Sequence, residues 1–209
     1  MRIPLNPALS PANNAAKYFK DYKKTYTAEQ TLLKLISDDE AEIGYLETVL
    51  DAINRAETLA DIAEIRTELL EEGYLNAKKQ NSKPKKIDAK GFKEYQSVEG
   101  YRILVGKNNR QNDYLTTKFA SKNDLWFHTK NIPGSHVLVL SNGAEVSDET
   151  ILFAARLAAE NSKASSSSNV AVDYTQVKNV KKPSGAKAGM VIYTTNKTVF
   201  VTPLKEEKE

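Results

Sequence analysis

The side chains best suited to chemistry lie within one stretch of the sequence, Gly100–Val139. Histidine acts as a general base or a metal ligand, and tryptophan stacks on flat ligands such as nucleobases. This stretch holds the only Trp and both His of the 209-residue chain, namely Trp126, His128 and His136. Such a concentration is typical of a binding or catalytic surface on a rigid scaffold, and equally of one buried, well-packed motif.

Catalysis and metal binding are poorly supported by the pattern. A metal site needs three or four ligands, whereas the chain has two His, no Cys and neither an HxH nor an HExxH motif. A nucleophilic triad would need Ser135 in a GxSxG turn, and Ser135 lies in PGSH instead. We therefore predict a protein that is not an enzyme, with no catalytic residue, no metal and no cofactor.

Stacking on RNA is the stronger functional interpretation of the Trp and the two His. In a strand over Leu125–His128, alternate side chains share a face, so Trp126 and His128 would be presented side by side. An aromatic ring beside an imidazole suits contact with an unpaired base. The alternative is that these side chains, together with His136, are buried and satisfied by neighbouring backbone groups.

An Asn-rich loop, residues 106–113, precedes a helix that we expect near Asp113–Ala120. Its side chains and the first N–H groups of that helix would point outward together and form an anion site. Lys107 and Arg110 would contact phosphates, while the amides would contact base edges or 2′-hydroxyl groups. Those amides are Asn108, Asn109, Gln111 and Asn112. The alternative is turn chemistry, because Asn tolerates left-handed backbone and Asp113 would cap the helix.

A second polar loop, Lys178–Gly189, combines four Lys with Gly, Pro and Ser. It lacks the GxxxxGK[ST] order of a Walker phosphate loop, so its expected contribution is electrostatic. The RNA-binding candidates here are Lys178, Lys181, Lys182 and Lys187, to which we add Lys118 and Lys130.

The charge of the chain is uneven, although its net value is only +3. Residues 1–90 carry 14 Lys and Arg against 15 Asp and Glu, whereas residues 100–200 carry 13 against 7. A positive, domain-sized surface favours a polyanion such as RNA as the partner. A surface that merely keeps the protein soluble is the alternative.

The C-terminal region has the pattern of an α+β domain. Short apolar or alternating runs predict strands at 101–105, 125–128, 136–140, 170–174, 190–194 and 198–202. The last two would form a hairpin around Thr195–Lys197. A strong helix is expected from an N-cap at Ser147 to about Lys163. Its packing face would consist of Ile151, Leu152, Ala155, Leu157 and Ala158. We expect an antiparallel or mixed sheet covered by this helix.

The N-terminal region has the pattern of a helical, coiled-coil-like arm. After Pro11, apolar side chains recur at steps of three and four residues. This stripe consists of Ala15, Phe19, Tyr22, Tyr26, Leu32, Ile36, Ile43, Leu46, Leu50 and Ile53. Ser37–Glu40 fits a capping box, so one long helix and two helices in line are both open. A shorter helix would begin with a cap at Asp61 and end at Gly73.

A narrow stripe on so long a helix needs a partner. Either the chain dimerises through the stripe or it is a fragment whose other coil helix lies upstream, and packing on the globular domain is the third alternative. We expect a helical region 1–77, a Lys-rich linker 78–90 and an α+β domain 91–209. No apolar run reaches the roughly 20 residues of a membrane span, and no secretory signal opens the chain. We therefore expect a cytoplasmic protein without membrane contact.

The ordered series of motifs resembles one protein family. The motifs VGKNNRQNDYLTTKFASKNDLWFHTKNIPGSHVLV, AARLAAENSKAS, VDYTQVKNVKKPSGAKAGMV and VFVTP resemble the NFACT-R domain of the NEMF/RqcH family. Upstream, LNPALSPANNAAKYFKDYKK, EIGYLETVL and IRTELLEEGYL are similar to the second half of its coiled-coil middle region. The resemblance covers almost the whole chain and implies a bacterial member that lacks the NFACT-N domain, the helix-hairpin-helix domain and the first coil helix.

The resemblance implies a role in ribosome-associated quality control. The intact protein is expected to bind large ribosomal subunits obstructed by peptidyl-tRNA and to recruit alanyl-tRNA, so that the stalled chain receives an untemplated alanine tail. The ribosome would perform the peptide-bond chemistry, and this fragment would contribute contacts with rRNA and tRNA. The competing class is a Gram-positive surface adhesin that binds fibronectin, which would need display by a route without a signal or an anchor motif.

Overall fold

The computed structural model describes residues 2–76 and 91–204. The predicted linker at 78–90 and the last five residues of the predicted C-terminal domain lie outside the described residues, and the division of the chain at this linker stays a prediction. The chain has two compact units, Met1–Gly44 and Tyr45–Glu209, and each is described by itself. No helix within the described residues has the length and apolar character that crossing a bilayer requires.

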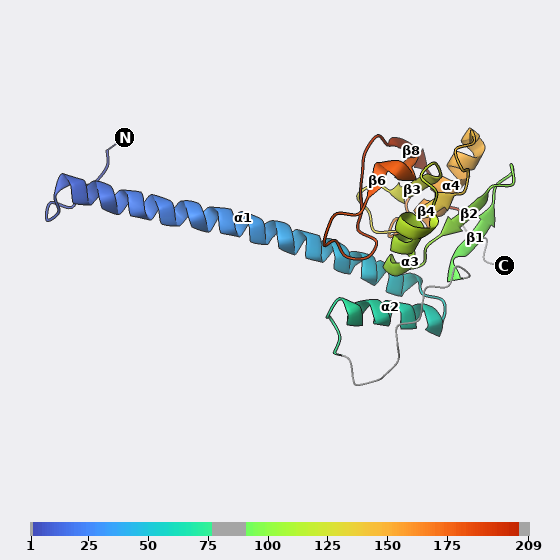
Figure 1. The fold of residues 1–209 in the computed structure, drawn as a ribbon, viewed down its shortest axis with the longest axis horizontal. Helices are drawn as coiled ribbons and strands as arrows, with labels where there is room; N and C mark the ends of the chain where they lie inside the picture. The colour runs from blue at the N-terminus through green and yellow to red at the C-terminus, as the bar shows by residue number, and fades with distance from the viewer. Residues whose placement is uncertain (1, 77–90, 205–209) are drawn as a thin grey trace. The chain divides into compact units, whose positions relative to one another are not determined.

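One continuous helix, α1 (Pro11–Arg55), accounts for most of the first unit (Figure 1). Its first residue is a proline, which suits that position because the opening turn needs no N–H donor there. The break that we considered at Ser37–Glu40 is wrong, since the helix continues through these residues. The predicted apolar stripe faces solvent in this unit. Its exposed members include Phe19, Tyr22, Tyr26, Leu32, Ile36 and Ile43.

The last turns of α1 belong to the second unit and pack on α2 (Leu59–Glu71). The buried side chains are Tyr45, Val49 and Ala52 of α1 with Ile65 of α2. The predicted stripe is therefore wrong in this region. Its members Leu46, Leu50 and Ile53 are exposed. The two sets have similar helical spacing and lie one residue apart, so periodicity alone does not separate them.

Helix α2 has a well-defined beginning and end. Its N-cap is Thr58 rather than the predicted Asp61. The Thr58 hydroxyl accepts the Asp61 N–H at 3.2 Å, and the Asp61 carboxylate accepts the Thr58 N–H at 3.0 Å, which makes a capping box. The predicted end at Gly73 is confirmed by its φ of +81° and by a hydrogen bond from the Tyr74 N–H to the Leu69 carbonyl.

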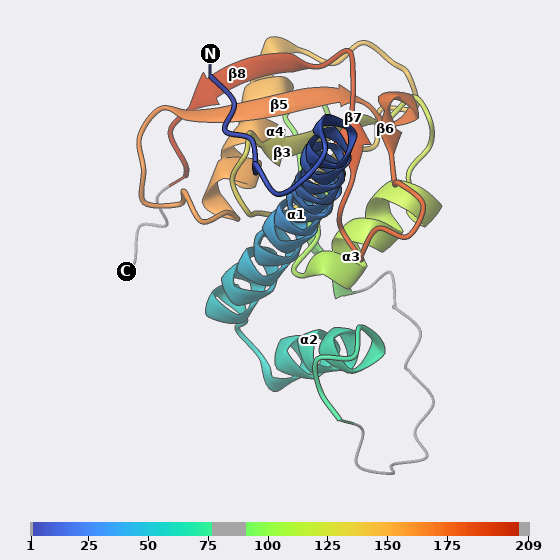
Figure 2. The same ribbon diagram turned by 90° about the vertical axis from the view of Figure 1, so that its left-hand side faces the viewer.

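Six antiparallel strands form the central sheet, in the order β1-β2-β4-β3-β5-β8. They are β1 (Lys93–Gln96), β2 (Arg102–Val105), β3 (Leu125–Thr129), β4 (Val137–Val139), β5 (Val170–Gln176) and β8 (Lys197–Val201). Figure 2 shows β5 and β8 side by side at one edge of the sheet. Strand β1 was not predicted, because its sequence KEYQ has no apolar run.

A separate two-stranded ribbon consists of β6 (Val180–Lys181) and β7 (Ile192–Tyr193). The predicted hairpin between the last two strands is wrong, because β7 pairs with β6 while β8 pairs with β5. Thr195, between β7 and β8, has a φ of +53°. The chain therefore uses this loop to pass from the ribbon to the edge of the sheet.

Helix α4 (Asp148–Glu160) covers one face of the sheet, which confirms the α+β class with a covering helix. Ser147 is its N-cap as predicted, and its hydroxyl accepts the Thr150 N–H at 3.3 Å. The predicted packing face is confirmed for Ala155, Leu157 and Ala158, which are buried. It is wrong for Leu152, which is 38% exposed.

The opposite face of the sheet carries a second core with α3 (Asn109–Tyr114), which continues into a π-helix, η2 (Leu115–Phe119). The helix predicted at Asp113–Ala120 therefore begins four residues earlier. Its N-cap is Asn108, whose side-chain oxygen accepts the Gln111 N–H at 2.9 Å. Much of the expected Asn-rich loop is thus helical.

Gly106 approaches α3 so closely that no side chain fits. A Cβ atom there would lie 2.2 Å from Asn112 Oδ1 and 3.1 Å from the Asn112 backbone nitrogen. Asn112 is buried; its Oδ1 accepts the His136 N–H at 3.0 Å, and its Nδ2 donates to the Gly134 carbonyl at 3.3 Å. This contact fixes the start of α3 and the loop before β4 against each other.

We expect Gly106→Ala to destabilise the second unit by roughly 2–4 kcal/mol, because Asn112 must give up a buried hydrogen bond or the backbone must shift. Thermal denaturation followed by circular dichroism measures the effect. Gly44→Ala is the control, since nothing lies within 4 Å of an added Cβ in that helix and Ala stabilises a helix by about 0.5–1 kcal/mol over Gly. Equal stability of the two variants would contradict the close contact at Gly106.

Candidate nucleic-acid interface

The Trp126 side chain is buried within the fold and is not available at the surface. It is 0% exposed, and its ring centroid lies 5.7 Å from that of His128 and 4.9 Å from that of Tyr193. The prediction that Trp126 and His128 share a face is confirmed, but Tyr193 of the β6–β7 ribbon packs on the indole. The expectation that Trp126 offers its ring to a base is therefore wrong.

Both histidines belong to the same cluster. The His136 Nδ1 lies 2.7 Å from the Thr116 hydroxyl, and the His128 and His136 rings are 5.4 Å apart. Burial lowers the pKa of His128 to about 4, and burial together with the neighbouring His128 lowers the pKa of His136 well below its usual range. Both rings are therefore neutral at pH 7. Among the described residues, no three His, Cys, Asp or Glu side chains gather where they would hold a metal ion.

The amide-rich segment, which we expected to face solvent, packs against the end of α1 and against α2. We call the region where α3 contacts these two helices the joint. The expectation that the segment faces solvent is wrong because its amides are buried. They are Asn108, Asn109, Gln111 and Asn112. The Asn109 Nδ2 donates to the Glu68 carboxylate at 3.0 Å, while Asn108 and Gln111 both donate to Glu64 Oε2 at 2.8 Å.

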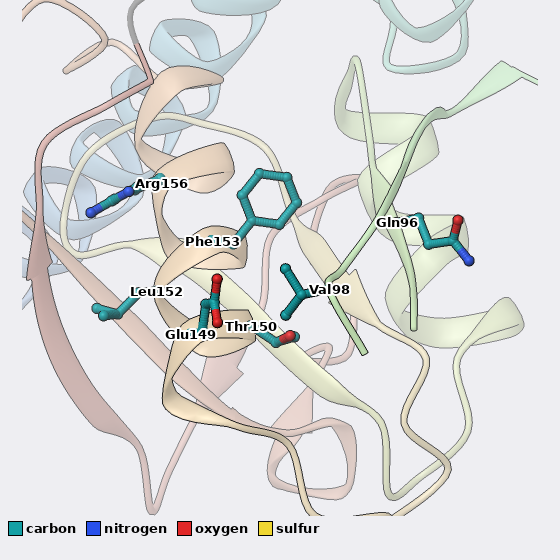
Figure 3. Close-up of a pocket in the computed structure, with 7 residues that line it drawn as sticks. All are labelled: Gln96, Val98, Glu149, Thr150, Leu152, Phe153 and Arg156. Atoms are coloured by element: carbon teal, nitrogen blue, oxygen red, sulfur yellow. The ribbon is translucent and has the colours of Figure 1, made fainter. Parts of the chain in front are cut away.

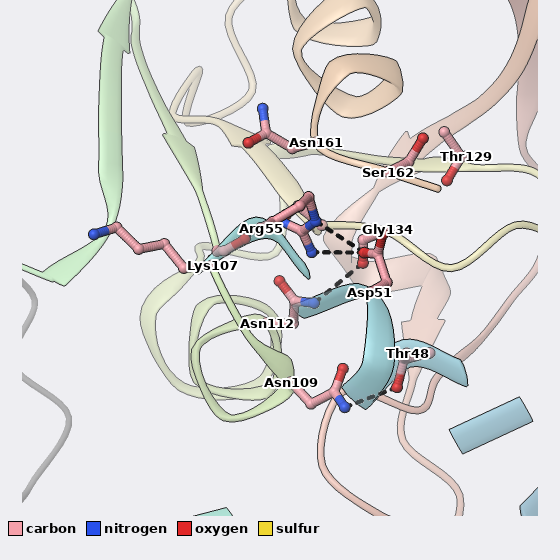
Figure 4. A network of polar contacts seen from close by, with 12 residues as sticks. Thr48, Asp51, Arg55, Lys107, Asn109, Asn112, Thr129, Gly134, Asn161 and Ser162 are labelled. Atoms are coloured by element: carbon pink, nitrogen blue, oxygen red, sulfur yellow. Dashed lines mark hydrogen bonds and ion pairs between the residues drawn. The ribbon is translucent and has the colours of Figure 1, made fainter. Parts of the chain in front are cut away.

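The end of α1 is held by a second set of polar contacts (Figure 4). The Arg55 guanidinium lies 2.8 Å from the Asp51 carboxylate and donates to the Ser135 hydroxyl at 3.1 Å. The Ser135 hydroxyl in turn donates to the Gly106 carbonyl. Figure 4 also shows Asn109 directed at Thr48, with 2.8 Å between the donor and the hydroxyl oxygen. Ser135 is thus a fully buried structural partner.

Three of the predicted basic candidates are engaged inside this joint. Lys107 pairs with Asp61 at 3.2 Å, and Arg110 pairs with Glu71 at 3.5 Å. The Lys187 ammonium lies 4.4 Å from the centroid of the Tyr45 ring and 4.5 Å from that of the Tyr74 ring. The positive charges of Lys107 and Arg110 are therefore already balanced by carboxylates of α2, at the place where we expected an anion site.

Five other lysines form an exposed basic surface, which we call the lysine face. They are Lys118, Lys122, Lys178, Lys181 and Lys182. The Lys178 N–H donates to the Lys122 carbonyl at 2.9 Å, and the Lys182 ammonium lies 2.6 Å from the Asp113 carboxylate. These contacts bring α3, the turn before β3 and the residues on both sides of β6 together, and η2 continues directly from α3.

The carboxylates beside the lysine face already have partners. Asp113 pairs with Lys182, and the buried Asp124 accepts the N–H groups of Ser121 and Asn142, each at 2.8 Å. An excess of cations therefore faces solvent there. Lys122 was not among the predicted candidates. Lys130 is also exposed, but it follows β3 whereas Lys122 precedes it.

A separate pocket of about 250 Å³ lies between the β1–β2 turn and α4. Figure 3 shows Val98 facing Phe153 across it, with Glu149 and Thr150 below. Its lining combines Val98, Leu152 and Phe153 with the polar side chains of Gln96, Glu149, Thr150 and Arg156. We assign no chemistry to this pocket.

Comparisons with known proteins place the chain in one family. Residues 1–88 match the family model for NFACT N-terminal and middle domains, and residues 91–194 match that for the NFACT protein RNA binding domain. A solved structure, the C-terminal of the fibronectin/fibrinogen-binding protein from Streptococcus suis, is similar with a TM-score of 0.86 and 44% identity. The match covers 96% of this chain and 79% of that one. The chain belongs to the NFACT family.

Two curated NFACT proteins illustrate the likeness in sequence. The Rqc2 homolog RqcH of Bacillus subtilis (strain 168) is 46% identical over 202 residues, which is 96% of this chain and 35% of that protein. The Rqc2 homolog RqcH of Streptococcus suis (strain 05ZYH33) is 45% identical over 208 residues, which is 99% of this chain and 37% of that protein. The chain spans about a third of the length of these relatives.

We expect the free energy of unfolding of this NFACT domain to fall as the pH is lowered from about 6.5 towards 4. His128 and His136 stay neutral when folded, whereas a histidine in the unfolded chain gains a proton near pH 6.5, so acid favours unfolding. Urea denaturation at a series of pH values measures the slope.

The double variant His128→Gln/His136→Gln isolates this effect. Its stability should depend less on pH over the same range. If the double variant does not fold, the single variant His128→Gln replaces it, because His128 is less buried than His136. The comparison with wild type is needed because burial raises the pKa values of Asp51 and Glu68, which changes stability in the opposite direction. Identical slopes would refute the contribution of the two histidines.

Proposed function

We propose that this chain binds RNA through the lysine face and is the RNA-contacting part of a ribosome-associated quality-control factor. The observation that carries the proposal is the exposed cluster of five lysines within the segment that matches the NFACT protein RNA binding domain. A phosphate backbone suits such a surface, because each phosphate that a lysine neutralises releases condensed counterions.

The proposed partners are the large ribosomal subunit, through its rRNA, and tRNA. The likeness to proteins named Rqc2 homolog RqcH supports this assignment. In the intact protein, these contacts would help to hold tRNA on an obstructed subunit while the stalled chain receives an untemplated alanine tail. The ribosome performs the bond formation, so the proposed role needs no catalytic residue in this chain. It also implies a cytoplasmic location.

Fibronectin binding is the second candidate function. The observation in its favour is the similarity to a solved structure whose name includes fibronectin/fibrinogen-binding protein. The lysine face does not distinguish between an acidic protein and RNA by charge alone. The dependence on salt and on the chemistry of the partner separates the two.

We expect Lys178→Glu/Lys181→Glu to weaken binding to a single-stranded RNA oligonucleotide and to purified large subunits by at least about tenfold at 0.1 M salt. Two lost phosphate contacts should also reduce the slope of log K against log salt concentration by about 1.4 for single strands. Fluorescence anisotropy across a salt series measures both quantities.

Lys17→Glu/Lys34→Glu is the matched control, because both lysines are exposed on α1 and the change in net charge is the same. This control should keep most of the affinity if the lysine face is the binding surface. Equal losses in both variants would indicate a response to net charge alone. Binding to fibronectin that is insensitive to salt, with no affinity for RNA, would favour the second candidate function.

A further inference from the structure

Strand β8 presents a large aromatic side chain to solvent on the sheet face opposite α4. Phe200 is 63% exposed. Its neighbours Val199 and Val201 belong to the core beneath α4, and alternate side chains of a strand point to opposite faces. Strand β8 is at the edge of the sheet (Figure 2), so among the described residues no further strand pairs with its outer side.

A cation lies in the same cross-strand row as this ring. Phe200 is paired with Ala171 of β5, and the Lys130 N–H, just after β3, donates to the Ala171 carbonyl at 2.9 Å. The small side chain of Ala171 therefore separates Phe200 from Lys130, which is 47% exposed. Ala171 thus forms a shallow floor, with an aromatic ring on one side and an ammonium group on the other.

A second cation, Arg156 of α4, lies near the same edge of the sheet. A hollow of about 510 Å³ lies beside Phe200 and is lined also by Arg156 and Leu152 of α4 and by Pro203 and Leu204. Arg156 is exposed, and no ion pair within the described residues involves it. Phe200 and Arg156 thus line one hollow at the edge of the sheet, while Lys130 lies in the cross-strand row of Phe200.

The carboxylate of Asp173, two residues along β5 from Ala171, is directed into the fold. Asp173 is buried, where it accepts hydrogen bonds from the hydroxyls of Tyr193 at 2.9 Å and of Thr198 at 2.5 Å. The Lys130 ammonium lies 3.9 Å from Oδ1, the oxygen that also accepts the Thr198 hydroxyl, so the carboxylate is satisfied from within the fold. The solvent side of the row therefore offers an apolar ring and positive charge, which together complement an unpaired nucleotide.

We propose that Phe200 is a stacking platform for an unpaired base of single-stranded RNA, and that Lys130 and Arg156 bind the flanking phosphates. The inference rests on the proposed function and adds a second RNA contact that acts on bases rather than on charge. RNA is favoured over an extended peptide pairing with β8, because strand pairing uses backbone N–H and C=O groups and calls for neither an exposed ring nor neighbouring cations. Stacking of this kind tolerates any base, so the site would bind without strong sequence preference.

The test compares two RNA probes of equal length, one with all its bases and one with abasic nucleotides at its central positions. We expect Phe200→Ala in the full chain to weaken binding of the base-bearing RNA by about 5- to 150-fold, the range that loss of one stacked base produces. Binding of the abasic RNA and the salt slope should stay unchanged. Phe200→Trp should restore the preference for bases.

Phe19→Ala is the control, since Phe19 is similarly exposed at 58% but lies in the first unit; it should not alter the preference for bases. If the lysine-face variant loses affinity while Phe200→Ala discriminates between the probes as wild type does, the stacking site is overturned and the proposed function stands. If the wild type binds neither RNA, both are overturned. Loss of fibronectin binding in Phe200→Ala, with RNA binding intact, would assign the edge to a protein partner and also overturn the inference.

Discussion

The buried carboxylate of Glu68 joins three helices, and the placement of the neighbouring elements depends on it. It is 2% exposed and accepts hydrogen bonds from the Tyr45 hydroxyl at 2.8 Å and the Asn109 amide at 3.0 Å, so the end of α1, α2 and α3 share one acceptor. Burial raises the pKa of Glu68, and the hydrogen bonds from Asn109 and Tyr45 act in the opposite direction without cancelling it. A buried carboxylate costs free energy unless its donors are in position, and this requirement makes the arrangement of the three helices specific.

The same joint positions the lysine face through a short series of contacts. Asn109 lies on α3 one turn before Asp113, whose carboxylate pairs with Lys182 and accepts the Gly189 N–H at 3.4 Å. The loop between β6 and β7 is thereby fastened to α3, and η2, which carries Lys118, follows directly. Anchoring one helix therefore orients lysines that are about 60 residues apart in the sequence. A preorganised cluster of this kind loses less side-chain and loop entropy on binding than lysines in a free loop.

Local patterns predicted those elements whose burial follows a period. Helix α4 was predicted from its Ser147 cap and its apolar spacing, and most strands from runs of branched residues. The amides of α3 were placed on the wrong side, because the acceptors of Asn108, Asn109 and Gln111 lie 41 to 47 residues upstream on α2. A polar residue with such a distant partner has the same local signature as a polar surface residue. The same reason explains the wrong prediction that Trp126 would stack on a base. Its ring is covered by Tyr193, which is distant in sequence and belongs to a ribbon strand of only two residues.

The direction of the positive field follows from the acidity of α2 rather than from the number of lysines. Residues 100–200 carry 13 basic against 7 acidic side chains, yet Lys107 and Arg110 are paired with Asp61 and Glu71 of α2. The side of the domain that contacts α2 is therefore close to neutral. Four lysines of the lysine face, Lys118, Lys122, Lys178 and Lys181, enter no ion pair within the described residues. Because unpaired charges dominate the attraction of a polyanion, RNA should approach the domain from the side of η2 and the β6–β7 ribbon. Neutralisation of one side by a neighbouring helix thus concentrates a modest net positive charge on the other side.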